Sequence, residues 1–165
     1  MFEVIIVCTG NTCRSPMAEG ILKRLLAAEA GGAKGDSAAA LISVSSAGTG
    51  ALVGFPAALE AVTVSQEAGI DIISHRARQL SAEMISGGDL VLTMEIDQRK
   101  VAVGLLPQAA GKIHCLSVFA GEQVAQDVAD PIGRGMKAYR EAQQRICDLL
   151  QKALPKILQQ ASQSR

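Results

Sequence analysis

The sequence predicts an α/β fold in which a doubly wound, four-stranded parallel sheet carries helices on both faces. Hydrophobic residues make up 48% of the chain, short aliphatic and β-branched runs recur along it, and stretches with helical spacing of apolar residues separate these runs. Alternating strands and helices favour parallel strands, because each helix carries the chain back across the sheet. The 165 residues suit one domain over residues 1–165.

Each strand is expected at a short apolar run, and each helix between capping and breaking residues. The predicted strands are residues 2–7, 41–47, 89–94 and 112–115. One helix is predicted to start at Pro16, with Ser15 as its N-cap, and to end near residues 31–32; another runs from Pro56 to Gly69. The other predicted helices are residues 95–104 and 136–158, the second disturbed at Pro155, while residues 33–40 are expected to be a linker and residues 116–129 a loop.

Composition and charge exclude several classes of function. Sixteen basic and sixteen acidic residues cancel, and aromatic residues are 2% of the chain, so neither nucleic acid nor an anionic membrane is an expected partner. No apolar run approaches the roughly 18 residues of a membrane-spanning helix. Four cysteines are too few for a disulfide scaffold, and with only His75 and His114 they form no zinc-binding pattern. A reducing, cytoplasmic location and no bound metal are therefore expected.

The most informative segment joins the first predicted strand to the first predicted helix. Cys8 stands at the carboxyl end of the strand, and Arg14 and Ser15 complete the pattern C-x5-R-S just before the helix. A short loop that closes on a helix N-terminus directs backbone N–H groups inward and forms an anion-binding cradle. We therefore predict a phosphate loop after the first strand, in which Gly10 leaves the backbone unrestricted and Arg14 donates to two oxygens. The same positive field favours a nucleophilic Cys8 thiolate, to which Ser15 can donate a hydrogen bond.

An alternative interpretation makes Cys8 a buried structural thiol and Arg14 an ordinary surface charge. An isolated C-x5-R spacing would favour that interpretation, because the pattern is short. The preceding strand, the helix that starts with proline and the adjacent Ser15 favour the nucleophile instead. Neither G-x4-G-K-[ST] nor G-x-G-x-x-G occurs in the chain, so a nucleotide-binding loop of those kinds is not predicted.

Residues 7–19, VCTGNTCRSPMAE, resemble the signature of the low molecular weight protein tyrosine phosphatase family. Residues 46–49 resemble the end of that family's second strand, residues 75–79 its histidine segment and Asp130-Pro131 its acid loop. The resemblance spans nearly the whole chain, except that residues 33–40 match nothing in the family pattern. It implies a hydrolase whose partners are phosphorylated proteins, with no metal or organic cofactor, and it leaves the oligomeric state open.

The resemblance also implies a role for each matching residue. Cys8 would attack phosphorus and form a phosphocysteine, Arg14 and the loop amides would hold the transferring oxygens, and Asp130 would act as general acid and base. Pro131 would restrict the backbone at Asp130, and Asp127 is a weaker candidate for a supporting charge. A larger group of residues would bind phosphate or support the loop: Thr9, Gly10, Asn11, Thr12, Cys13, Ser15, Ser46 and His75. Of these, Asn11 suits a left-handed backbone position.

Two positions indicate the substrate. Tyrosine-specific members of the family follow Asp-Pro with aromatic residues, whereas this chain has Ile132 and Gly133, neither of which can stack on a phenyl ring. They also carry a branched aliphatic residue where this chain has Thr12, whose hydroxyl suits a polar guanidinium. The loop sequence resembles the bacterial protein arginine phosphatase branch, although arginine-specific relatives keep an aromatic at the position of Ile132. Phosphoarginine in proteins is therefore the expected substrate, with phosphotyrosine as the alternative.

The remaining cysteines distinguish further alternatives. Cys13 is either a small packing residue or, as the resemblance implies, a resolving thiol that condenses with oxidised Cys8. Cys115 and Cys147 are expected to be packing residues. An arsenate reductase would need two extra cysteines close together in a mobile segment, so that activity is disfavoured. A non-catalytic phosphate-binding module is also disfavoured, because Cys8, Arg14, Ser15 and Asp130 occur together.

Overall fold

The four strands form one parallel sheet, in the order β2-β1-β3-β4. A computed structural model describes residues 1–32 and 37–164 of the chain. The strands are β1 (Phe2–Cys8), β2 (Ile42–Gly48), β3 (Leu90–Thr93) and β4 (Ile113–Cys115). They pair in a register that sets Cys8 beside Gly48 and Val7 beside Thr93. The predicted four-stranded parallel sheet is therefore confirmed, with β1 in its interior and its carboxyl edge shared by all four strands.

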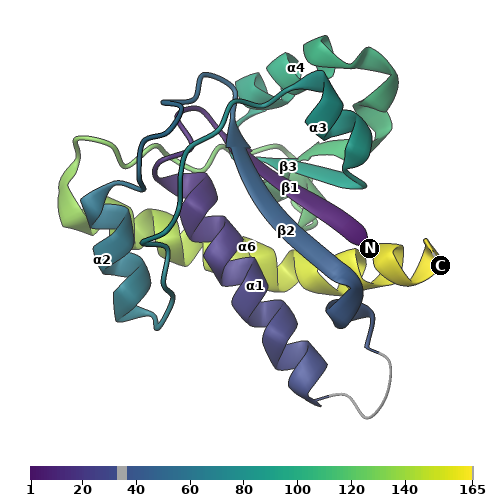
Figure 1. Cartoon of the computed structure of the whole chain (residues 1–165), viewed down its shortest axis with the longest axis horizontal. Helices are drawn as coiled ribbons and strands as arrows, with labels where there is room; N and C mark the ends of the chain where they lie inside the picture. Colours follow the sequence, from purple (N-terminus) through teal and green to yellow (C-terminus); the bar gives the residue numbers. More distant parts are fainter. Residues whose placement is uncertain (33–36, 165) are drawn as a thin grey trace.

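Helices cover both faces of the sheet, as predicted (Figure 1). One face packs against α1 (Arg14–Gly32) and α6 (Gly135–Gln163), with α2 (Leu59–Glu67) packed on these two helices, and the other face packs against α3 (Ala82–Gly87) and α4 (Ile96–Leu105). Successive side chains of β1 point to opposite faces. Val4 and Ile6 accordingly join the larger core with α1 and α6, whereas Ile5 and Val7 join the smaller core with α3 and α4.

The first helix starts earlier than predicted. It begins at Arg14, so Ser15 lies in the first turn and is not the N-cap. Its hydroxyl is 2.9 Å from the sulfur of Cys8. The functional contact thus replaces the capping contact that the sequence suggested.

Other boundaries also differ from the sequence prediction. Residues 116–129 were expected to be a loop, but α5 (Leu116–Phe119) forms a short helix because Leu116 and Phe119 are buried in the larger core. The helix expected from Pro56 to Gly69 spans only Leu59–Glu67. Of the expected linker, residues 33–36 lie outside the described residues. Three short elements were not predicted: α3 (Ala82–Gly87) and the 3-10 helices η1 (Ala38–Leu41) and η2 (Pro107–Lys112).

The last helix, α6, continues through Pro155 to Gln163, beyond the predicted end at residue 158. Pro155 is on its exposed side, whereas Ala153 and Ile157 on either side of it are fully buried in the larger core. Tertiary packing on both flanks therefore maintains the helix where a proline would otherwise disturb it. Among the described residues, no helix is long and apolar enough to cross a membrane.

Candidate active site

The predicted phosphate loop lies at the carboxyl edge of the sheet, between β1 and α1. Its carbonyl groups are held by the segment that follows β2: the amide of Thr49 donates to the carbonyl of Cys8 (3.0 Å), that of Gly50 to Thr9 (3.1 Å) and that of Leu52 to Gly10 (3.2 Å). Among residues 1–32 and 37–164, by contrast, no oxygen accepts a hydrogen bond from the amides of residues 9–13. The loop carbonyls thus accept hydrogen bonds from the neighbouring segment, while the loop amides remain available to donate to a bound oxyanion.

Two backbone positions shape this loop. Gly48 allows the segment after β2 to approach closely, because a Cβ there would lie 2.3 Å from the carbonyl oxygen of Thr9. Asn11 has a φ of 57°, which confirms the predicted left-handed conformation. The φ of Gly10 is not positive, and a Cβ there would make only an ordinary contact with Thr12. The unusual backbone conformation therefore falls on Asn11.

Buried hydrogen bonds connect Cys8 to the predicted supporting residues. The side-chain amide of Asn11 donates to Ser15 Oγ (2.8 Å) and to Ser46 Oγ (3.0 Å). Its Oδ1 accepts from the backbone amide of Arg78 (2.9 Å), which fixes the orientation of the Asn11 amide. Ser15 Oγ already accepts one hydrogen bond, so its single proton is available for Cys8 Sγ, 2.9 Å away. The network therefore presents a hydrogen-bond donor to the sulfur.

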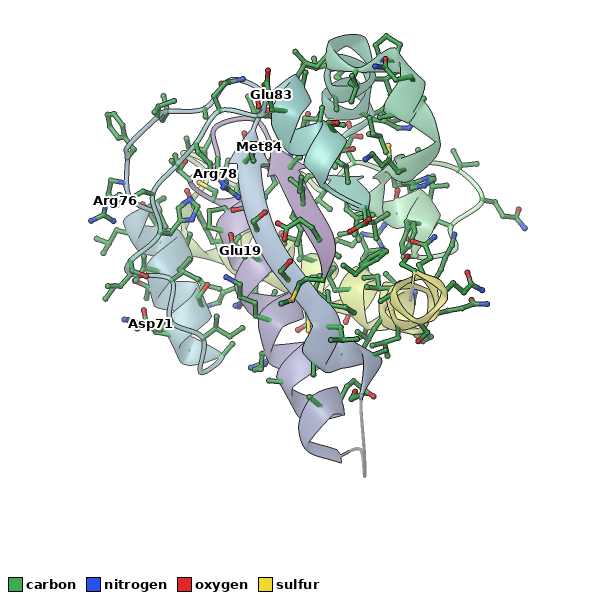
Figure 2. All side chains as sticks on the ribbon, turned by 45° about the vertical axis from the view of Figure 1, so that its right-hand side comes forward. Glu19, Asp71, Arg76, Arg78, Glu83 and Met84 are labelled. Carbon is green, nitrogen blue, oxygen red and sulfur yellow. The ribbon has the colours of Figure 1, made fainter. Side chains whose placement is uncertain are left out.

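Residues that the sequence reasoning did not assign to the site complete this network. Glu19 Oε2 accepts from Ser46 Oγ (2.6 Å), and the guanidinium of Arg78 donates from Nε to the carbonyl of Ser46 (2.8 Å). Figure 2 shows Glu19 and Arg78 beside β2, whereas Arg76 points away from the molecule. His75, which was predicted, contacts the carbonyl of Asn11 through Nε2 at 2.7 Å. The segments that resemble the family contained both missed residues, so their position in those segments was the available signal.

Arg14 is almost completely buried, with 2% of its side chain exposed. Its Nη1 donates to Glu95, the residue before α4, and to the carbonyl of Val128 (2.7 Å), while Nη2 lies 3.5 Å from Asp130 Oδ2. The predicted pair of Arg14 and Asp130 is therefore brought together. Glu95 was not predicted, since a lone carboxylate 81 positions along the chain carries no sequence signal.

Asp130 and Asp127 occupy different environments. The side chain of Asp130 is 44% exposed and its Oδ1 accepts from the amide of Ile132 (3.1 Å), so the carboxylate is held in a turn at the mouth of the loop. Asp127, the weaker candidate for a supporting charge, instead accepts from the amide of Ile96 (2.9 Å) at the start of α4. Asp127 therefore joins the acid loop to α4.

The start of α4 also reaches the phosphate loop directly. The buried side chain of Gln98 accepts from the amide of Glu95 (2.9 Å) and donates to Thr9 Oγ1 (3.1 Å). One end of α4 thus contacts Arg14 through Glu95 and Thr9 through Gln98. Among the described residues, no three histidine, cysteine or acidic side chains form a cluster that could hold a metal ion.

Cys13 and Thr12 lie side by side in the loop and are both buried. Cys13 Sγ is 3.2 Å from the hydroxyl of Tyr139 on α6 and 3.7 Å from Thr12 Oγ1. Burial raises the pKa of the Cys13 thiol above its ordinary value, although the hydrogen bonds with Tyr139 and Thr12 act in the opposite direction. Burial also raises the pKa of Tyr139. The raised pKa favours the neutral thiol of Cys13, whereas a nucleophilic cysteine reacts as the thiolate.

Glu95 provides the first testable prediction. Changing Glu95 to glutamine removes the closest counter-charge of a buried guanidinium, so we expect the free energy of unfolding to fall by about 2 kcal/mol in phosphate-free buffer. Saturating inorganic phosphate should remove most of this deficit, because the bound anion takes over the role of the carboxylate. Denaturant unfolding with and without phosphate measures both effects. The exposed Glu141→Gln variant is the control, and equal stabilisation of Glu95→Gln and wild type by phosphate would contradict the prediction.

Comparisons with known proteins agree with this geometry. The sequence profile described as low molecular weight phosphotyrosine protein phosphatase matches residues 3–164. A probable low molecular weight protein-tyrosine-phosphatase, EpsP, of Ralstonia nicotianae is 38% identical over 143 residues, 87% of each chain. A protein-arginine-phosphatase of Geobacillus stearothermophilus is 34% identical over 94% of this chain and 96% of its own.

Solved structures show the same similarity in three dimensions. The low molecular weight protein tyrosine phosphatase of T. tengcongensis has a TM-score of 0.82 at 39% identity, covering 94% of this chain and 99% of its own. The YwlE arginine phosphatase of Geobacillus stearothermophilus has a TM-score of 0.83 at 31% identity, covering 100% and 98%. A protein named as a tyrosine phosphatase and one named as an arginine phosphatase therefore resemble this fold to the same degree, with TM-scores of 0.82 and 0.83.

Proposed function

Because the chain belongs to the low molecular weight phosphotyrosine protein phosphatase family, and is thus a cysteine-based phosphatase, we propose that it hydrolyses phosphoarginine in proteins. The observation that carries this proposal is the threonine at position 12 of the phosphate loop. Its hydroxyl is compatible with a polar guanidinium, whereas a branched aliphatic side chain would favour an aryl ring. The protein-arginine-phosphatase relative supports the same substrate, and the lack of an aromatic pair directly after Asp130-Pro131 disfavours a phenyl ring.

The proposed reaction has two steps. In the first, the Cys8 thiolate attacks phosphorus, the P–N bond breaks, and Asp130 in its acid form protonates the departing guanidine nitrogen. In the second, Asp130 as carboxylate takes a proton from water, the oxygen of that water attacks phosphorus, and the S–P bond breaks to release phosphate and the Cys8 thiolate. The hydroxyl of Ser15, 2.9 Å from the sulfur, stabilises the thiolate both before the attack and as the leaving group.

Arg14 and the loop amides are proposed to hold the transferring oxygens through both transition states. The unengaged amides of residues 9–13 and the buried guanidinium of Arg14 supply donors where negative charge develops. Glu95 and the carbonyl of Val128 fix Nη1 of Arg14, so the guanidinium requires little reorganisation when the substrate binds. Thr9, Gly10, Asn11, Thr12, Cys13, Ser46 and His75 are proposed to bind phosphate or to keep the loop in shape.

A direct substrate comparison tests the proposed specificity. We expect kcat/KM for a phosphoarginine peptide to exceed that for the matched phosphotyrosine peptide, and Thr12→Ile to lower the ratio of the two values at least about tenfold. The half-buried Thr63→Ile variant on α2, outside the site, is the control. A wild-type enzyme that prefers phosphotyrosine, or a ratio unchanged by Thr12→Ile, would refute the proposal. Ile132, 57% exposed beside the acid, is a second proposed specificity position.

Tyrosine phosphatase activity is the second candidate, because relatives with that name match at comparable identity. Arsenate reduction has no such support. Cys115 lies in β4 and Cys147 in α6, so neither belongs to the mobile cysteine pair that a thiol relay requires. A non-catalytic phosphate-binding module would be insensitive to loss of Asp130.

The leaving group reveals the role of Asp130. Asp130→Ala should lower kcat about 10²- to 10⁴-fold for substrates with a poor, basic leaving group, because it removes their general acid. The loss should be much smaller for an activated aryl phosphate, whose leaving group departs without a proton. Rates measured over a series of aryl phosphates of graded leaving-group pKa give the comparison, with Asp97→Asn as the control. Equal losses across the series would identify another residue as the acid.

We also propose a redox role for Cys13. An oxidant such as hydrogen peroxide would convert the Cys8 thiolate to a sulfenic acid, and the Cys13 thiol could then displace water to form a disulfide. The position of Cys13 in the same loop supports this role. Its raised pKa lowers the fraction of thiolate, so the condensation is expected to be slower than with an exposed thiol.

A further inference from the structure

Large apolar side chains are exposed on the segment that follows β2. We call Leu52, Val53, Phe55 and Leu59 the apolar rim; their exposed fractions are 48%, 66%, 58% and 77%. No charged residue occurs from Gly48 to Leu59. Single exposed apolar residues are ordinary, but a group of them on an uncharged segment is typical of a surface that binds a partner.

Hydrogen bonds hold the apolar rim against the phosphate loop. The amide of Leu52 donates to the carbonyl of Gly10 (3.2 Å), and the amide of Ala58 donates to the carbonyl of Thr12 (2.8 Å). Phe55 lies between these two attachments and is fixed in turn by the amide of Ala77 (2.8 Å). In Figure 1 this segment (blue) passes beside the loop between β1 and α1 (purple). The rim therefore forms a fixed border next to the place where phosphate is expected.

We infer that the apolar rim binds the side chains that flank the phosphorylated residue of a protein substrate, and that these side chains are apolar. The inference rests on the proposed function only in that the substrate is a phosphorylated polypeptide, whose chain must continue from the phosphorylated residue across the neighbouring surface. The surface it meets carries no charge between Gly48 and Leu59, and Ile132, 57% exposed, lies on the acid loop. Burial of apolar flanking residues against such a surface lowers the free energy of binding. Charged flanking residues would instead lose hydration without gaining a charged partner.

Pairs of peptides test the inference. Each pair carries one phosphorylated residue, flanked either by leucine and valine or by serine and glycine, and is made with phosphoarginine and again with phosphotyrosine. Wild-type enzyme should favour the apolar flanks about tenfold in kcat/KM, through KM. The double variant Phe55→Ser/Leu59→Ser should reduce this preference to less than twofold, with kcat/KM for p-nitrophenyl phosphate unchanged. Leu105→Ser, which removes a 41% exposed leucine at the end of α4, is the matched control.

Each outcome decides the matter. Absence of a flank preference in the wild type, or a preference that survives in the double variant, would overturn the inference. The alternative is that the apolar rim binds a second copy of the chain. Sedimentation of wild type and of the double variant over a range of concentrations tests this: self-association of the wild type that the double variant loses would assign the rim to a second copy and would also overturn the inference. A flank preference confined to phosphotyrosine peptides and lost in the double variant would support the docking surface while refuting phosphoarginine specificity.

Discussion

Replacing Cys8 by serine is expected to abolish turnover, with kcat reduced at least about 10⁴-fold. A serine hydroxyl is not ionised at neutral pH, and the neighbouring Ser15 donates a hydrogen bond without removing a proton. The phosphate loop should nevertheless keep its shape, since its carbonyls are held by the segment after β2 and its centre by Asn11. Phosphate and vanadate should therefore still bind.

The measurement combines single-turnover kinetics with calorimetric titration of the anions. Cys147→Ser is the matched control, because Cys147 is a half-buried cysteine on α6 and lies outside the site. It should retain activity and anion binding. Activity of Cys8→Ser near that of the wild type would show that another group is the nucleophile, and the proposed mechanism would then fail.

Replacing Arg14 by lysine is expected to lower kcat/KM about 10²- to 10³-fold, although the positive charge is kept. One ammonium group cannot reproduce the two nitrogen positions of Arg14, of which Nη1 contacts Glu95 and Val128 while Nη2 faces Asp130. Binding of vanadate, which mimics the five-coordinate transition state, should weaken more than binding of phosphate. This difference follows if the second nitrogen contributes mainly when negative charge is redistributed in the transition state.

Kinetics and inhibitor titrations on purified variants give both quantities. Arg99→Lys is the matched control: Arg99 on α4 donates to the carbonyl of Ile113 (2.8 Å) and so has a structural contact of its own. A loss for Arg14→Lys no greater than for Arg99→Lys would remove Arg14 from the reaction. If binding of vanadate and of phosphate weakened equally, Arg14 would contribute only to ground-state binding.

The strands of this fold are predictable because burial on both faces of a parallel sheet requires continuous aliphatic runs. β1 shows this most clearly, since Val4 and Ile6 enter one core while Ile5 and Val7 enter the other. Short helices are less predictable. In α5, Leu116 and Phe119 are the only two buried apolar side chains on one turn, which is too little periodicity to distinguish a helix from a loop.

Local signals also fail where two functions compete for one side chain. Ser15 before Pro16 is a strong N-cap pattern, yet its hydroxyl is engaged with Cys8 and Asn11, and α1 begins at Arg14 instead. Tertiary hydrogen bonds therefore outweigh the local capping preference at Ser15. At Asn11, by contrast, local preference and tertiary structure agree: the expected left-handed conformation is observed, and the side-chain amide is fixed by Ser15, Ser46 and Arg78.

By itself the sequence determined the sheet, the loop after β1 and the identity of the residues expected to react, because these depend on short apolar runs and on a motif of neighbouring positions. Only the tertiary structure decided which groups control Arg14 and Cys8. Glu95, Val128 and Asp130 meet Arg14, and Glu19 and Arg78 complete the network behind Cys8, from segments far apart in the chain. The parallel sheet brings these segments to one edge, and buried polar groups then take whichever partners packing places within reach.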